Sequence, residues 1–215
     1  MSAPLDTRRQ VLAKLHAATK PGDPAPAYAA LPRPYIRRGS LDRKACIELL
    51  AQRLREYDAE VIECGPSDLR DAIASQLAAS GRRIFVAPAE LPGDWLVSGF
   101  DWRIDHGLSH AEIEQAEGVV TAAFCAVADS GTIVLHHGPG EGRRVLTLLP
   151  DWHLCILRTS QVVETLPEYF DRCAQPPVLA TYVSGPSATA DIEMTRIKGV
   201  HGPRFLLVIL VHDED

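Results

Sequence analysis

The stretch AEVIECGPSDLRDAIASQLAASGRRIFVAP, Ala59 to Pro88, has the pattern of a strand, a helix and a second strand. Its middle part carries apolar side chains four residues apart, on one face of a helix, at Leu69, Ile73 and Leu77. Gly81 ends this helix, and the apolar run that follows predicts a buried strand. The alternation predicts an α/β fold with a mostly parallel sheet flanked by helices on both faces.

The flanking sequence extends this pattern in both directions. Asp42 precedes a predicted helix with an apolar stripe, and Ser109 precedes a short predicted helix that runs through Ala116. Buried strands are predicted at four apolar runs, 133–135, 154–157, 178–183 and 205–211. A helix predicted from Ser160 places on one face Val162, Val163, Leu166, Phe170 and Cys173. Residues 93–107 have no clear period and are predicted to form a loop.

The N-terminal part of the chain differs from the rest. Asp6 is predicted to cap a first helix with an apolar face formed by Val11, Leu12, Leu15 and Ala18. The stretch PGDPAPAYAALPRP, Pro21 to Pro34, then carries five prolines in fourteen residues, which predicts a semi-rigid linker. We therefore expect a helix and linker over residues 1–38 and an α/β domain over residues 39–215. The helix is expected to pack far from its sequence neighbours or on a second subunit of a homo-oligomer.

Composition excludes several classes of protein. The chain has 215 residues, 46% of them hydrophobic, and a net charge of −6, so it lacks the basic footprint of a nucleic-acid-binding protein. Its longest apolar run, Phe205 to Val211, has seven residues and is too short to span a membrane. The N-terminal sequence MSAPLDTRRQVLAKLH lacks the apolar segment of a signal peptide. These features predict a cytoplasmic protein.

The cysteines and histidines do not form a metal-binding pattern. Five cysteines are spaced by gaps of 18, 61, 30 and 18 residues, which match no zinc or iron–sulfur motif. We expect them to be buried, reduced thiols. The eight histidines are dispersed apart from His136 and His137, which would point to opposite sides of a strand. The sequence therefore predicts no metal site and no cofactor in this chain.

The turn ADSGT, residues 128–132, is the first candidate functional site. It lies between two apolar segments, where Gly131 permits a tight turn. Asp129 could act as a catalytic base or accept a hydrogen bond from a substrate, and Ser130, Gly131 and Thr132 could contact a ligand. The alternative is a purely structural turn in which Asp129 caps backbone N–H groups.

Two further candidates lie between Leu135 and the strand predicted at residues 154–157. The run HHGPGEGRR, residues 136–144, combines three glycines with two arginines, and Arg143 or Arg144 could bind an anion through its guanidinium group. The alternative is a mobile connection between strands. His153 could act as a catalytic acid or base because histidine titrates near neutral pH, or it could be a structural hydrogen-bonding residue.

The fourth candidate is VSGPSATADIE, residues 183–193. Here an apolar run ends and a helix is predicted to begin, so exposed N–H groups could bind a carboxylate or phosphate. The predicted ligand-binding residues of this stretch and of the GVHGPR sequence after it are Ser184, Gly185, Ser187, Thr189, Glu193 and His201. Asp191 is a candidate catalytic carboxylate, although Asp191 and Glu193 do not share a helix face. An ordinary helix N-cap has the same sequence pattern.

The order of these motifs is more specific than any one of them. TAAFCAVADSGTIVL, GPGEGRRVLTLLPDWHLCIL, SGPSATADIE and GVHGPR, followed by an apolar strand, resemble the lactate-utilisation protein C family (LutC/YkgG, LUD domain) over about residues 40–212. Where the family has Thr-Gly-Thr after the acidic residue, this chain has Ser130-Gly131-Thr132. The resemblance implies a fold similar to the NagB/RpiA/CoA-transferase group. It also implies a place in a multi-protein system that oxidises L-lactate to pyruvate, with iron–sulfur clusters only in the partner proteins.

Three functions stay open at this point. The first is a subunit of a lactate-oxidising complex that binds a small carboxylate or phosphate, or a partner protein. The second is a stand-alone enzyme on a CoA-transferase-like fold that acts on a sugar phosphate, folate or acyl-CoA, with Asp129, Asp191 or Glu193 as its carboxylate. The third is a scaffold whose motifs only shape the edge of the sheet. For the first two we expect the Asp129 turn, Arg143 and His201 to face the SGPSATADIE segment around one anion-binding pocket.

Overall fold

The structure of the chain is a computed structural model, and it describes residues 4–18, 25–173, 175, 177–184 and 202–213. The chain divides into two compact units, Met1–Tyr35 and Ile36–Asp215. The first unit contains helices α1 (Pro4–Ala18) and α2 (Ala25–Ala29). Asp6 therefore lies inside the first helix and does not precede it, and a short helix forms within the proline-rich stretch that was predicted to be extended.

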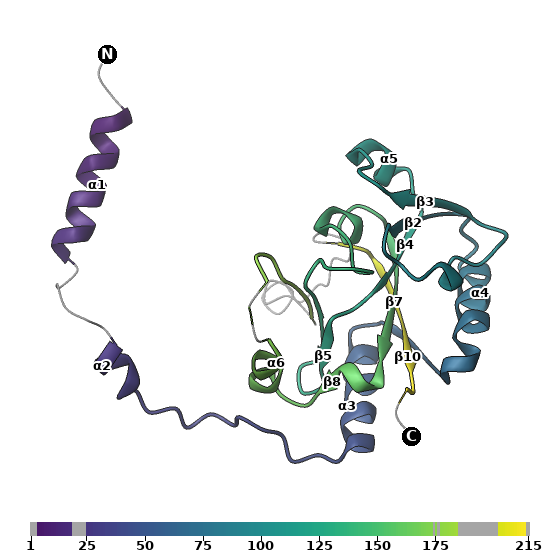
Figure 1. Ribbon diagram of the computed structural model, residues 1–215, viewed down its shortest axis with the longest axis horizontal. Helices are drawn as coiled ribbons and strands as arrows, with labels where there is room; N and C mark the ends of the chain where they lie inside the picture. The colour runs from purple at the N-terminus through teal and green to yellow at the C-terminus, as the bar shows by residue number, and fades with distance from the viewer. Residues whose placement is uncertain (1–3, 19–24, 174, 176, 185–201, 214–215) are drawn as a thin grey trace. The chain divides into compact units, whose positions relative to one another are not determined.

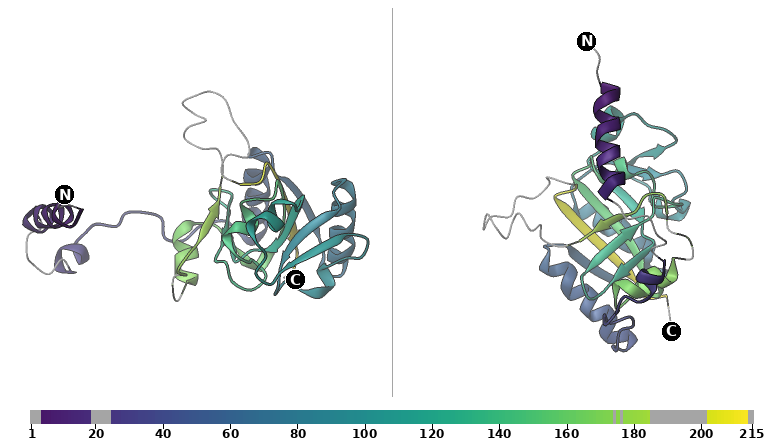
Figure 2. Two further views of the ribbon diagram at one scale, coloured as in Figure 1. Left: turned by 90° about the horizontal axis from the view of Figure 1, so that it is seen from above. Right: turned by 90° about the vertical axis from the view of Figure 1, so that its left-hand side faces the viewer.

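The second unit is built on a six-stranded sheet in which all strands are parallel (Figure 1). In spatial order its strands are β1 (Glu60–Cys64), β10 (Phe205–Val211), β7 (Trp152–Arg158), β4 (Gly118–Ala122), β2 (Ile84–Pro88) and β3 (Asp101–Asp105). Although β10 is the last strand of the chain, it lies in the interior of this sheet, as Figure 2 shows. The predicted α/β fold with a parallel sheet is confirmed.

The strands in the middle of the large sheet are apolar along their whole length because both faces of the sheet are covered. On β10, Leu207 and Ile209 pack in one core cluster, and Val208 and Leu210 pack in another. The first cluster includes helix α4 (Leu69–Ala79), and the second includes helix α3 (Arg43–Glu56). Figure 1 shows these two helices on opposite sides of the sheet. This two-sided burial explains why an unbroken apolar run such as FLLVILV forms a strand.

A smaller sheet packs on the α3 side. Its spatial order is β8 (Val162–Val163), β5 (Cys125–Val127), β6 (Thr132–Leu135) and β9 (Thr181–Val183). The β5–β6 and β6–β9 pairs are antiparallel, whereas β5 and β8 are parallel. Only the last three residues of the strand predicted at 178–183 pair with a neighbour. Among the residues that the structure describes, every helix is too short or too polar to traverse a lipid bilayer.

The helix caps agree with the sequence at two places. Asp42 accepts a hydrogen bond from the Ala45 N–H at the start of α3. Ser109 forms a reciprocal capping box with Glu112 at the start of α5 (His110–Glu114). The helix predicted around Leu69, Ile73 and Leu77 is α4, and a 3₁₀ turn, Pro66–Asp68, leads into it.

Two predictions of secondary structure are wrong. Residues from Ser160 do not form one helix, because Val162 and Val163 pair with β5 and helix α6 (Leu166–Arg172) starts only after a capping box between Thr165 and Glu168. Residues 93–107 are not a continuous loop, because Asp101–Asp105 forms the edge strand β3.

Candidate functional site

The predicted Asp129 turn is the hairpin between β5 and β6. Its Asp129 side chain is exposed, and the Asp129 N–H donates to the Glu164 carbonyl at 3.0 Å. Gly131 has a φ of +64°, and a Cβ there would lie 2.6 Å from the Cβ of Arg53 on α3. Only glycine fits this position without strain. The close approach to α3 accounts for Gly131 by packing and leaves the Asp129 carboxylate open to solvent.

Hydroxyl groups connect this turn to the end of β9. The Ser130 and Thr132 hydroxyl oxygens are 2.7 Å apart, and the Thr132 hydroxyl donates to the Ser184 hydroxyl at 2.9 Å. The structure thus brings together members of the first and fourth predicted clusters. The other predicted residues of the fourth cluster lie outside the described residues and stay predictions, namely Gly185, Ser187, Thr189, Asp191, Glu193 and His201.

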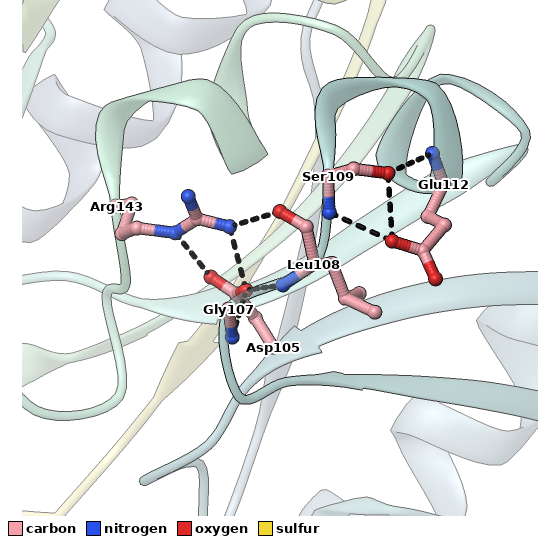
Figure 3. Close-up of polar contacts among 6 residues, drawn as sticks. All are labelled: Asp105, Gly107, Leu108, Ser109, Glu112 and Arg143. Carbon is pink, nitrogen blue, oxygen red and sulfur yellow. Dashed lines mark hydrogen bonds and ion pairs between the residues drawn. The ribbon is translucent and has the colours of Figure 1, made fainter.

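Arg143 is held by a carboxylate of this chain (Figure 3). Its Nε and Nη2 donate to the two carboxylate oxygens of Asp105 at 2.8 and 2.7 Å, and Nη2 also donates to the Leu108 carbonyl. The Asp105 side chain is 4% exposed and accepts from the N–H groups of Gly107 and Leu108 as well. Hydrogen bonding by Arg143 holds the pKa of Asp105 below its usual range. The charge of Arg143 is therefore already balanced, and its Nη1 takes no part in these bonds.

His153 lies deep in the large sheet. Its residue is 2% exposed, and its Nε2 is 2.8 Å from the Thr121 hydroxyl on the neighbouring strand β4. Burial, and secondarily the charge of Arg144, lowers the pKa of His153 to about 4, so the imidazole is neutral at pH 7. This placement favours the structural hydrogen-bonding role that the sequence left open beside catalysis.

A different polar cluster lies at the carboxyl-end edge of the large sheet. The loop of residues 136–142, which we call the histidine loop, follows β6 and crosses the ends of β4 and β2. The Ala122 N–H donates to the Gly140 carbonyl at 2.8 Å, and a Cβ on Gly142 would lie 2.8 Å from Pro88. Open α/β sheets bind their ligands outside the carboxyl ends of their strands. This position makes the histidine loop the candidate site.

Glu141 fixes the shape of the histidine loop from inside. The residue is 6% exposed, and its Oε2 accepts from the N–H of His136 and from the N–H of His137 at 3.2 Å. Successive backbone N–H groups of this kind form a concave anion-binding site. Here the anion is a carboxylate of the same loop, and burial raises its pKa. The backbone at His137 has a φ of 59°, a conformation that non-glycine residues adopt rarely.

The ring of His137 is oriented by a bond at each nitrogen. Its Nδ1 is 2.9 Å from the Gly142 carbonyl, and its Nε2 is 2.7 Å from the Thr181 hydroxyl on β9. Because a carbonyl only accepts, Nδ1 carries the hydrogen. In the neutral ring Nε2 then accepts from Thr181. His137 therefore links the histidine loop to the small sheet.

His136 begins a chain of titratable side chains that reaches the surface. Its Nε2 is 2.9 Å from the Tyr169 hydroxyl, which is 3.1 Å from the Tyr182 hydroxyl. Tyr169 is 1% exposed and Tyr182 is 46% exposed. The His136 ring stacks on Phe124 with the ring centroids 3.7 Å apart. The Cys173 sulfur is 3.9 Å from the same Nε2.

The protonation states in this chain follow from burial. Burial lowers the pKa of His136, with a smaller contribution from His137, and burial raises the pKa of Tyr169. At neutral pH the imidazole is therefore neutral and the Tyr169 phenol keeps its proton. A neutral imidazole that is hydrogen-bonded through two phenols to the surface can accept a proton from a ligand hydroxyl and pass it to solvent.

Sequence reasoning noticed the two histidines but missed this cluster. Its members come from four segments, namely Phe124, the histidine loop, α6 with its C-cap Cys173, and β9, and their proximity depends on α6 and β9 packing beside the end of β6. The one local signal of this cluster is Glu141, an acidic residue between two glycines. In this loop the sequence interpretation considered only Arg143 and Arg144 as ligand-binding residues. The structure also separates the Asp129 turn, which contacts α3 and Glu164, from Arg143, which contacts the loop after β3. It does not bring these two groups into contact.

The cysteines were predicted to be buried and reduced, and three of the five are buried: Cys46, Cys125 and Cys155. Burial raises the pKa of Cys125 to about 11 and of Cys155 to about 12, so both thiols stay protonated. Cys64 and Cys173 are only half-buried, contrary to the prediction. Within the described parts of the chain, no three His, Cys, Asp or Glu side chains are grouped so that they could hold a metal ion.

Comparisons with known proteins agree with the order of the sequence motifs. Residues 42–211 match the family model of the LUD domain. A protein from Deinococcus radiodurans named "Lactate utilization protein C" is 40% identical over 188 residues, which cover 85% of this chain and 86% of that protein. A protein of the same name from Bacillus subtilis is 30% identical and covers 78% of each chain.

A solved structure supports the same assignment. The crystal structure of a DUF162 family protein from Deinococcus radiodurans superposes with a TM-score of 0.70 at 35% sequence identity, covering 80% of this chain and 99% of that one. The LUD-domain match spans both sheets and the histidine loop. The chain therefore belongs to the LUD-domain family of lactate utilization C proteins.

Proposed function

We propose that this protein is a cytoplasmic component of the oxidation of L-lactate to pyruvate, that it acts with iron–sulfur partner proteins, and that it binds a small carboxylate at the histidine loop. The observation that carries the proposal is the 40% identity to a lactate utilization protein C over 85% of this chain. The carboxyl-end position of the loop gives a place for the ligand.

The chemistry of the loop suits a 2-hydroxy acid. The neutral imidazole of His136 can accept a hydrogen bond from the ligand hydroxyl, and Tyr169 and Tyr182 extend that contact to the surface. Arg143 directly follows the loop, and its Nη1 is suited to a carboxylate oxygen.

Oxidation of the hydroxyl to a ketone removes two electrons and two protons. In this proposal the iron–sulfur partner proteins would take both electrons and the proton of the C–H bond, and the imidazole–phenol chain would carry the hydroxyl proton to solvent.

Gene deletion followed by growth on L-lactate tests the proposed pathway. We expect the deletion strain to lose growth on L-lactate, to keep growth on pyruvate, and to recover when the intact gene is returned. Undiminished growth on L-lactate would contradict the proposal. Turnover of an acyl-CoA, sugar phosphate or folate by the purified chain alone would instead support a stand-alone enzyme.

A further inference from the structure

The first unit contains a helix with an apolar stripe that is not buried. On α1, Val11, Leu12 and Leu15 are 53%, 41% and 56% exposed. Arg8 precedes Val11 by three residues and Leu12 by four, so it lies on the same face. None of the side chains described in this unit is buried.

A helix of this kind needs a surface to pack against. Isolated helices of about 12–15 residues are only marginally stable in water, and most helical stability in proteins comes from packing of the apolar face. α1 has 15 residues. Its stripe of leucine and valine with a basic residue at one end fits a surface that is apolar in the middle and acidic at its rim.

The charge of the chain is distributed very unevenly. Residues 1–38 hold seven Lys and Arg against two Asp and Glu, a net charge of +5. Residues 39–215 hold fifteen Lys and Arg against twenty-six Asp and Glu, a net charge of −11. The N-terminal segment is thus electrostatically complementary to the α/β domain of any copy of this chain.

The proline-rich sequence leads directly into the α/β domain. The sequence from residue 19 to residue 38 contains five prolines, and helix α2 (Ala25–Ala29) forms among them. Directly after it the chain is fixed, because the Gly39 N–H donates to Glu168 at 3.2 Å and the Leu41 N–H donates to Glu164 at 2.7 Å.

We propose that residues 1–38 form an arm whose helix α1 docks, through Arg8, Val11, Leu12 and Leu15, on the acidic α/β domain of a second copy of this chain. Two arms exchanged about a two-fold axis make the same contact twice, as isologous dimers do. This inference does not depend on the reaction in which the protein takes part.

Sedimentation velocity of the full chain over a range of concentrations tests the proposal. We expect a dimer that weakens as the salt concentration is raised from about 0.1 M to about 1 M. In the double variant Leu12→Asp, Leu15→Asp the dissociation constant is expected to rise at least about tenfold. The matched control Gln10→Asp, Ala13→Asp changes the charge of the arm equally on the opposite face and is expected to dimerise more tightly than the stripe variant.

Three results would overturn the proposal. One is a full chain that stays monomeric at about 100 µM in low salt. Another is a stripe variant that dimerises as tightly as the control. The third is a monomer whose α1 is protected from proteolysis, or that binds anionic lipid vesicles, because the stripe would then be covered by its own chain or by a membrane.

Discussion

The two ends of the β6–β9 ladder carry different kinds of polar side chain. At one end Ser130, Thr132 and Ser184 bond to one another through hydroxyl groups, which do not titrate near neutral pH. At the other end an imidazole, two phenols and a thiol form a chain from the buried Tyr169 to the surface. Both ends are polar, but only the second contains imidazole groups, the side chains whose ordinary pKa lies near neutral pH. This difference is the reason why we propose the ligand site at the second end, where the histidine loop crosses the carboxyl ends of the large sheet.

Among substitutions at the two ends of the ladder, we expect the largest loss of unfolding free energy at Glu141. Glu141→Ala removes the acceptor of two loop N–H groups and should cost about 3 kcal/mol of unfolding free energy, measured by urea denaturation at pH 7. Glu141→Gln is the matched control, because its amide oxygen can still accept from both N–H groups. Equal stability of the Ala and Gln variants would contradict the structural role of this side chain.

The stability difference between the wild type and Glu141→Gln should depend on pH. Burial raises the pKa of Glu141 above its unfolded value, so the folded state binds the proton more tightly. The wild type should therefore lose stability relative to Glu141→Gln as the pH rises through the folded pKa of this carboxyl group. Urea denaturation of both proteins at a series of pH values measures this difference, and a constant difference would contradict the assignment.

A smaller effect is expected at the phenol of the chain. Tyr169→Phe leaves the His136 Nε2 and the Tyr182 hydroxyl without their shared partner and should cost about 1–2 kcal/mol. Tyr182→Phe removes an exposed hydroxyl and should cost about 0.5 kcal/mol or less. Thermal or urea denaturation of the two variants measures both values. A larger loss of stability in Tyr182→Phe than in Tyr169→Phe would show that the Tyr169 hydroxyl does not stabilise the hydrogen-bonded series from His136 to Tyr182.

The ion pair between Arg143 and Asp105 should contribute less to the free energy of unfolding. Asp105→Asn weakens the contact to Arg143, which is 46% exposed, so we expect a loss of about 1 kcal/mol at pH 7. Because the pKa of Asp105 is lowered in the folded state, this contribution is present above the unfolded pKa and lost as the pH falls through the folded one. Acid denaturation of both proteins checks it: their stabilities should converge at low pH.

We expect the smallest loss of stability at the end of the ladder that carries the hydroxyl groups of Ser130, Thr132 and Ser184. Ser130→Ala removes one hydroxyl at a solvent-exposed position and should cost about 0.5 kcal/mol, measured by urea denaturation. Lactate-dependent growth of a strain that carries this variant should equal that of the wild type. A growth defect without a stability defect would move the functional site to the Asp129 turn.

Much of the fold could be predicted because it rests on local patterns. The runs that form β7 and β10 are apolar on both faces, and the caps at Asp42 and Ser109 are read directly from the sequence. The strand β3 was missed because its sequence DWRID is mostly charged or polar and it pairs on one side only, with β2. The helix from Ser160 was wrong because Val162 and Val163 pair with β5, a contact that no local period reveals.

The candidate site was predictable only in part. The Ser130, Thr132 and Ser184 contact was expected because both segments were placed at the ends of strands. The partners of His136 could not be found, because Phe124, Tyr169 and Tyr182 come from three distant segments and each reads as an ordinary core or surface residue. The ion pair of Arg143 could not be predicted, because its partner Asp105 lies 38 residues away, in a region without a clear pattern.

The most direct test of the site is complementation of the deletion strain with His136→Gln, Tyr169→Phe and Ser130→Ala, each at the protein level of the wild type. We predict that growth on L-lactate falls strongly with His136→Gln, falls partly with Tyr169→Phe and is unchanged with Ser130→Ala. Normal growth with His136→Gln together with a defect in Ser130→Ala would contradict the account and place the function at the hydroxyl end of the β6–β9 ladder.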